Sequence, residues 1–224
     1  RDAQESRGLG DVYKRQRYNS RVGLADRISR RRFIVFRNSF HGRTVFALSM
    51  TSVPSPVMIK DFHPLFRSAI AVPFPAAVFS GFDPETSRRY NASAVDRSLS
   101  AIEGLLRRHA GTVVGIIIEP IQSAGGHNVA IPSFFEEVSR LAVKYGAYLG
   151  FDEVQTGMGA SGKLYYVDHL NLAAPPQALV SAKKFGVGVL YMLDHLRDVG
   201  VLDSTWGGPV SYTHLRAHET PEHL

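Results

Sequence analysis

The 224-residue sequence contains no cysteine. A disulfide framework, a thiolate-bound metal and a cysteine nucleophile are therefore all excluded. No apolar run approaches the roughly 20 residues of a membrane-spanning helix, and no signal peptide or internal repeat is recognisable. These absences predict a cytoplasmic protein that does not enter a membrane.

Charged residues are not abundant either, at 21% of the chain, and the 44% of hydrophobic residues is ordinary for a globular domain. The net charge is +6, and basic residues are densest between Arg27 and Arg32. Aromatic residues are not interleaved there, as a base-stacking surface requires. We interpret this cluster as a solvated helix face and expect no nucleic-acid partner, although a basic binding module stays an alternative to an enzyme.

Both ends of the chain look foreign to the rest. Segments 6–16 (SRGLGDVYKRQ) and 210–220 (VSYTHLRAHET) resemble translated sequencing adapter, and such segments are excluded from arguments about a fold. We predict an adapter-derived tail at 1–16, a natural internal fragment of one large domain at 17–209, and a second adapter-derived tail at 210–224.

Short apolar runs predict strands of a buried sheet. They lack the polar–apolar alternation of strands that face water, which is typical of a parallel sheet covered on both faces. The predicted strands are 32–37, 112–118, 147–152 and 178–181. Because predicted helices lie between them, we expect an α/β fold with a mostly parallel, doubly wound sheet.

The helices are predicted from apolar residues spaced three and four apart, over 94–109 and 132–145. Pro132 and Gly146 mark the start and stop of the second helix, and another helix is expected from Thr44. Residues 52–92 are rich in proline, phenylalanine and serine and show no period, which predicts a long irregular connection.

Ionisable residues follow three of the predicted strands: Glu119, then Asp152 and Glu153, then Lys183 and Lys184. Ligands of parallel sheets bind beyond the carboxyl ends of the strands. Burying an ionised carboxylate is unfavourable unless a cation lies beside it, so Asp152 faces either a protein cation or a cationic ligand. A lysine amine can form an imine with a carbonyl cofactor such as pyridoxal 5′-phosphate (PLP). The ring nitrogen of that cofactor needs an acidic partner.

Five motifs occur in order along the chain. They are FHGRT (40–44), EPIQS (119–123), FDEVQTGMG (151–159), SAKK (181–184) and STWGG (204–208). Together they resemble the class III aminotransferases, which are PLP-dependent enzymes of fold type I, nearest to the lysine ε-aminotransferase and GABA aminotransferase branch. The resemblance implies that the chain is an incomplete large domain of this fold and that PLP is its cofactor.

The resemblance also implies which residues hold the cofactor ring. Asp152 matches the carboxylate that pairs with the ring nitrogen, and Gln155 matches the residue that bonds the phenolic oxygen. Val154 matches the residue under the ring, and Phe40 matches the aromatic side chain stacked on its other face.

Four further positions match family residues that act on the cofactor or substrate. Lys184 is the expected Schiff-base lysine, with Lys183 as the runner-up. Thr205 matches a hydroxyl offered to the PLP phosphate by a neighbouring subunit, which implies a homodimer with shared active sites. Arg43 matches an arginine that binds a substrate carboxylate.

The remaining polar residues of these motifs receive smaller roles. His41 is expected only to pack, and Glu119 to make a structural hydrogen bond or to act near the cofactor. His127 and Asn128 are placed at the entrance. Ala124 departs from the family, because many relatives have a glutamate there that can engage an active-site arginine when donor and acceptor alternate.

The resemblance thus implies transfer of an amino group from a donor with a distal amine, such as lysine, ornithine or GABA, to a 2-oxo acid such as 2-oxoglutarate. Two alternatives stay open at this point. One is racemase or decarboxylase chemistry on the same fold, because the same lysine and aspartate serve all PLP reactions. The other is a non-catalytic, basic α/β binding module.

Overall fold

The computed structural model describes residues 32–53, 69–79, 81 and 83–193. The predicted tails and Thr205 lie outside these described residues. Within the described part of the chain, no helix is long and apolar enough to cross a membrane.

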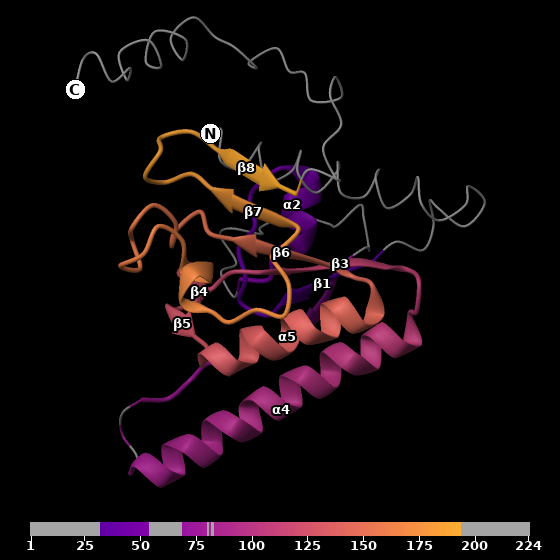
Figure 1. Cartoon of the computed structure of the whole chain (residues 1–224), viewed down its shortest axis with the longest axis vertical. Coiled ribbons are helices and arrows are strands. Elements are labelled where there is room, and N and C mark those ends of the chain that lie inside the picture. The colour runs from indigo at the N-terminus through magenta and orange to yellow at the C-terminus, as the bar shows by residue number, and fades with distance from the viewer. Residues whose placement is uncertain (1–31, 54–68, 80, 82, 194–224) are drawn as a thin grey trace, which may run out of the picture.

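A six-stranded sheet forms the centre of the molecule, with strand order β2-β1-β3-β6-β7-β8 (Figure 1). All neighbouring strands are parallel except β7 and β8. The strands are β1 (Arg32–Phe36), β2 (Ala69–Val72), β3 (Val113–Ile118), β6 (Tyr148–Asp152), β7 (Ala178–Ser181) and β8 (Val189–Met192). The predicted α/β fold, its mostly parallel sheet and its four predicted strands are therefore confirmed.

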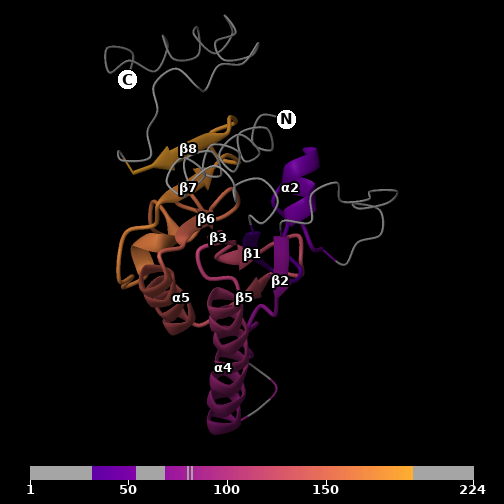
Figure 2. The same ribbon diagram turned by 90° about the vertical axis from the view of Figure 1, so that its right-hand side faces the viewer.

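Helices cover both faces of the sheet. The long helices α4 (Pro84–Arg108) and α5 (Pro132–Tyr145) lie side by side on one face, and the short α2 (Val45–Met50) lies on the other (Figures 1 and 2). Alternating residues of β1 serve the two faces: Ile34 and Phe36 pack in the core under α4 and α5, whereas Phe33 and Val35 pack with Met50 of α2. Successive side chains of a strand point to opposite faces of the sheet. A sheet covered on both faces therefore needs apolar residues at consecutive positions.

Helix α5 has the predicted bounds. Pro132 occupies its first turn, and Gly146 ends it with a left-handed φ of 65°, donating its N–H to the carbonyls of Ala142 and Val143. Glycine adopts this conformation without a steric penalty, which is why it ends so many helices. The chain then turns directly into β6.

The prediction for residues 52–92 is wrong in part, because β2 and the start of α4 lie within them. Helix α4 begins at Pro84, ten residues before the predicted start, and Asp83 caps it by accepting hydrogen bonds from the N–H groups of Glu85 and Thr86. Its first turns are mostly exposed, so they carry no apolar period. Strand β2 is a short, largely half-exposed edge strand and is missed for the same reason.

Three shorter elements complete the fold: β4 (Ile121–Gln122), β5 (Asn128–Val129) and the 3₁₀ turn η1 (Tyr166–His169). Strands β4 and β5 form a separate antiparallel pair. Because β1, β3, β6 and β7 are parallel neighbours, the loops that follow them all leave from one edge of the sheet. We call this the carboxyl edge.

Candidate active site

The loops after β6 and β7 are joined by backbone hydrogen bonds at the carboxyl edge. The N–H of Glu153 donates to the carbonyl of Val180 at 2.8 Å, and the N–H of Lys183 donates to the carbonyl of Val154 at 3.2 Å. These bonds fix the DEVQ segment beside the lysine turn. The predicted meeting of acidic and basic strand ends is thereby confirmed.

Asp152, the last residue of β6, contacts His41 from the loop after β1. The two side chains are 4% and 2% exposed, and Oδ2 of Asp152 lies 2.9 Å from Nδ1 of His41. The other carboxylate oxygen, Oδ1, accepts a hydrogen bond from the N–H of Val154 at 3.3 Å. The expectation that His41 only packs is therefore wrong, because its ring bonds the carboxylate on which the predicted chemistry depends.

The backbone around His41 is held by Thr51. The N–H of His41 donates to Oγ1 of Thr51 at 3.0 Å, and that hydroxyl lies 3.3 Å from the carbonyl of Gly42 and 3.1 Å from the carbonyl of Ala47. At the far side of the ring, Nε2 of His41 is buried and has no hydrogen-bond partner among the described residues.

Phe40 is held through its backbone by Glu119. The N–H of Phe40 donates to Oε2 of Glu119 at 2.8 Å, and Glu119 is only 5% exposed. The phenylalanine itself is half-buried. Of the two roles considered for Glu119, the structure shows the structural hydrogen bond.

The EPIQS segment and the turn that follows it clamp the start of the same loop. Gln122 is fully buried; its Nε2 donates to the carbonyl of Arg37 at 2.7 Å, and its Oε1 accepts from Nδ2 of Asn128 at 3.1 Å. Gly125 lies so close to Asn38 that an added Cβ would stand 2.0 Å from the Asn38 carbonyl oxygen. Asn128 therefore helps to support the loop, and its expected place at the entrance stays a prediction.

Glu153, beside Asp152, has a structural task that the sequence analysis missed. It is fully buried, and it accepts hydrogen bonds from the N–H groups of Tyr166 (2.6 Å) and Val167 (2.9 Å) and from Oγ1 of Thr156 (3.0 Å). Burial raises the pKa of Glu153, against the opposite effect of these donors. The sequence held one signal for this role, namely a second carboxylate, Glu153, directly after Asp152 at the end of an apolar strand.

The lysine turn follows β7. The N–H of Gly186 closes it on the carbonyl of Ala182 at 3.0 Å, and Gly186 adopts φ = 73°, a conformation that favours glycine. Lys183 and Lys184 are both exposed. The structure therefore puts the pair at the predicted edge and leaves the choice between the two lysines a prediction.

The other predicted site residues differ in exposure. Val154 is 4% exposed, while Gln155 and Arg43 face solvent. Within the described residues, neither Arg43 nor Lys184 forms an ion pair.

The donor set fits PLP. A buried carboxylate can face the ring nitrogen, the adjacent strand end supplies primary amines, and a buried valine lies two residues beyond the carboxylate. The buried pair of Asp152 and His41, whose Nε2 has no partner among the described residues, is a buried polar arrangement that packing alone does not explain.

The family model for aminotransferase class-III matches residues 13–208. The chain belongs to the class-III aminotransferase family. It is 37% identical to the 4-aminobutyrate aminotransferase of Dictyostelium discoideum over 180 residues, which are 78% of this chain and 35% of that relative. It is 35% identical to the human mitochondrial 4-aminobutyrate aminotransferase over 187 residues, covering 81% of this chain and 36% of the human protein.

The fold is also that of a solved class-III enzyme. The lysine aminotransferase from M. tuberculosis in the internal aldimine form superposes with a TM-score of 0.75 at 26% identity, covering 90% of this chain and 47% of that one. The chain thus spans about a third of the length of the curated relatives and about half of the solved enzyme. The expected family and its PLP dependence are confirmed, whereas the roles of single residues and the tail boundaries stay predictions.

Proposed function

We propose that this chain supplies the cofactor-binding core of a PLP-dependent aminotransferase. The enzyme moves an amino group from a donor with a distal amine, of the lysine, ornithine or GABA type, to a 2-oxo acid such as 2-oxoglutarate. The observation that carries the proposal is the convergence of Asp152 and the lysine turn at one edge of the sheet. The names of the relatives, 4-aminobutyrate and lysine aminotransferases, support this donor class.

The residues divide the work as follows. When bound, PLP supplies an electron sink for the reacting carbon. The Asp152 carboxylate supplies the negative charge that favours a protonated ring nitrogen. Val154 and Phe40 would support the two faces of the ring, and Gln155 would bond its phenolic oxygen. The Lys184 amine would hold the cofactor and would carry a proton to and from the substrate carbon as a general base and acid.

Arg43 would bind the carboxylate group of the amino donor. In donors of this class, that carboxylate lies far from the reacting amine. Its exposed guanidinium leaves from the same loop as Phe40 and can grip a carboxylate by two parallel hydrogen bonds. Binding a remote group in this way orients the reacting one. A panel of donors tests this: Arg43→Ala should raise KM for lysine, ornithine and GABA. If simple α-amino acids or uncharged amines outperform all three and the variant leaves their rates untouched, the donor class is wrong.

Two finer points belong to the same proposal. Thr205, contributed by a second subunit, would bond the PLP phosphate, so that the active enzyme is a homodimer with shared sites. A cytoplasmic location is supported by the absence of cysteine from the sequence, although the human relative is named a mitochondrial protein.

The decisive experiment uses the full-length protein and PLP. A visible absorption band, followed by ping-pong exchange between an amino donor and 2-oxoglutarate, supports aminotransfer, whereas racemisation or decarboxylation without exchange contradicts it. Borohydride reduction and mass spectrometry then locate the cofactor. An adduct on Lys184 is expected, and an adduct on Lys183 would reverse that assignment.

A further inference from the structure

We propose that Glu153 is a positioning residue that keeps Gln155 and the lysine turn at a fixed spacing. Its buried carboxylate ties the turn that carries Gln155 to the 3₁₀ turn η1. The inference rests on the proposed function, because the two groups that it spaces are those proposed for neighbouring substituents of the PLP ring.

Both carboxylate oxygens of Glu153 accept hydrogen bonds. Oε2 accepts from the N–H of Tyr166 at 2.6 Å and from Oγ1 of Thr156 at 3.0 Å, and Oε1 accepts from the N–H of Val167 at 2.9 Å. The side chain is fully buried. Three donors around one carboxylate match its ionised form, which only accepts hydrogen bonds. Glu153 therefore fixes Thr156 relative to η1.

Thr156 lies in the turn that carries Gln155. The N–H of Gly157 donates to the carbonyl of Glu153 at 2.9 Å, so residues 153–157 form one hydrogen-bonded turn, which we call the glutamate turn. Thr156 is only 4% exposed, whereas Gln155 faces solvent. Because the side chain next to Gln155 is bonded inward to Glu153, the backbone that presents Gln155 is held in place.

The glutamate turn also packs against the lysine turn. An added Cβ at Gly157 would stand 2.5 Å from Oγ of Ser181 and 3.2 Å from Cδ1 of Tyr165, the residue before η1. The N–H of Lys183 donates to the carbonyl of Val154 at 3.2 Å. The glutamate turn thus contacts both the lysine turn and the residue before η1, and a shift of it would have to move one of them.

The spacing matters because of the structure of PLP. Its phenolic oxygen and its aldehyde carbon are bonded to adjacent ring atoms. Gln155 is proposed to bond that oxygen and Lys184 to bond that carbon, so a wrong spacing misplaces one partner when the other is bound. A misplacement of about 1 Å can lower a rate by about 100-fold. Arg43 belongs to a different loop, the one after β1, so binding of the donor carboxylate should change little.

The test uses the full-length protein loaded with PLP. Thr156→Val removes the hydroxyl bonded to Glu153 and nearly keeps the shape of the side chain, whereas Thr156→Ser keeps the hydroxyl. Glu153→Gln replaces one acceptor oxygen by an amide nitrogen that cannot accept. The matched control is Ser98→Ala, which removes another buried hydroxyl, the one that donates from α4 to the carbonyl of Pro73 at 2.7 Å.

We expect Thr156→Val to shift the visible absorption band of bound PLP, because that band depends on the hydrogen bond to the phenolic oxygen. It should lower kcat by about 10- to 100-fold and leave KM for the donor nearly unchanged. Thr156→Ser should restore the band and kcat. Ser98→Ala should lower the melting temperature as Thr156→Val does, with the wild-type band and kcat. Adding Thr156→Val to Glu153→Gln should cause no further loss, because both changes break the same bond.

Three results would overturn the inference. If Thr156→Val lowers only the melting temperature and keeps the wild-type band and kcat, Glu153 has a purely structural role, while the proposed function stands. If Ser98→Ala shifts the band as much as Thr156→Val does, the effect does not come from the glutamate turn, and the proposed function again stands. If the wild-type protein binds no PLP or exchanges no amino group, the inference fails together with the proposed function.

Discussion

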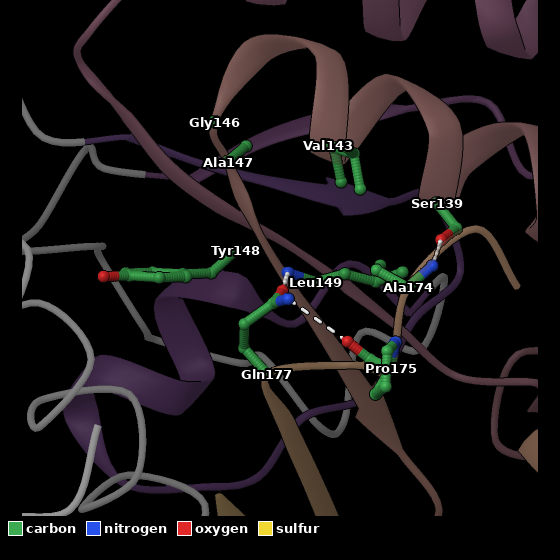
Figure 3. Close-up of a pocket in the computed structure, with 10 residues that line it drawn as sticks. Ser139, Val143, Gly146, Ala147, Tyr148, Leu149, Ala174, Pro175 and Gln177 are labelled. Atoms are coloured by element: carbon green, nitrogen blue, oxygen red, sulfur yellow. Dashed lines mark hydrogen bonds between the residues drawn. The ribbon is translucent and has the colours of Figure 1, made fainter. Parts of the chain in front are cut away.

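The two edges of the sheet use their polar groups differently. At the edge opposite the loops described above, a pocket of about 190 Å³ lies between the last turns of α5 and the segment before β7 (Figure 3). Its polar side chains are paired within the protein. Oε1 of Gln177 accepts from the N–H of Leu149 at 2.6 Å and Nε2 donates to the Pro175 carbonyl at 3.2 Å, while Oγ of Ser139 accepts from the N–H of Ala174 at 3.4 Å.

The carboxyl edge has the opposite character. It buries the Asp152–His41 pair, leaves Nε2 of that histidine unpaired among the described residues, and exposes Lys184 and Arg43 without ion pairs within the described part of the chain. This pocket and the proposed active site therefore lie at different edges of the sheet. We propose the active site at the carboxyl edge because Lys184 and Arg43 form no ion pair there with the described residues, and not by the volume of this pocket.

The largest expected effect comes from removing the amine at the carboxyl edge. Lys184→Ala in the full-length protein should lower transamination by at least about 10³-fold, because general acid–base catalysis alone contributes up to about 10⁴-fold. Steady-state rates with 2-oxoglutarate as acceptor measure this loss. Lys183→Ala is the matched control and should stay within a few-fold of the wild type. A reversed result would make Lys183 the reacting lysine.

The charge of Asp152 should matter next most. Asp152→Asn keeps the size of the side chain but removes the charge that favours a protonated ring nitrogen. Transamination should fall by about 10²- to 10³-fold, the scale of losing one preorganised electrostatic partner, while PLP stays bound. Absorbance of the purified variant checks binding, and turnover checks catalysis. Near-normal turnover would contradict the role given to this carboxylate.

Local signals made much of the fold predictable. The bounds of α5 follow from Pro132 and Gly146, which act within one turn of the helix. Strand β3 follows from an unbroken apolar run that is buried on both faces. The start of α4 was missed because its exposed first turns hide the apolar period, although Asp83 followed by proline is itself a start signal.

For the site, the sequence predicts which strand ends meet but not which side chains touch. The parallel order placed Asp152 near the lysines, since strands in such a sheet end at one edge. Pairing of Asp152 with His41 depends instead on how two distant loops fold over that edge. Glu153 shows the same limit, because its donors belong to η1, a turn with no clear sequence signal.

A substitution at the pocket edge should affect stability and leave catalysis alone. Gln177→Ala removes the acceptor of the Leu149 N–H, and a buried unpaired donor costs about 1–3 kcal/mol. The free energy of unfolding, from chemical denaturation, should fall by about that amount, while kcat stays within about twofold. Gln177→Glu keeps an acceptor oxygen and is the control. A large loss of kcat at unchanged stability would show that the pocket takes part in function.

Folding shifts the pKa values of Glu153 and Glu103 in opposite directions. Glu153 at the carboxyl edge has its pKa raised by burial. Glu103 of α4 accepts hydrogen bonds from Lys144 and Tyr145, the last two residues of α5. It also forms an ion pair with Arg107 of its own helix. These partners, Lys144 foremost, lower the pKa of Glu103 to about 2. One carboxylate is thus harder to ionise on folding and the other easier.

The smallest expected effect is the loss of this exposed link between α4 and α5. In the unfolded chain the pKa of a glutamate is about 4.3. The pKa of Glu103 is lower than this in the folded chain. Its contribution to stability is therefore present above about pH 4.3 and disappears as the pH falls toward about 2. Glu103→Gln should lower the melting temperature slightly at pH 7, and this difference should shrink to nothing near pH 2.

The control is Glu137→Gln, which removes an ion pair with Arg140 inside α5 and leaves the link between the helices intact. Melting curves between pH 7 and pH 2 make the comparison, and a Glu103→Gln difference that is the same at every pH would show that the carboxylate does not stabilise the packing of α4 against α5.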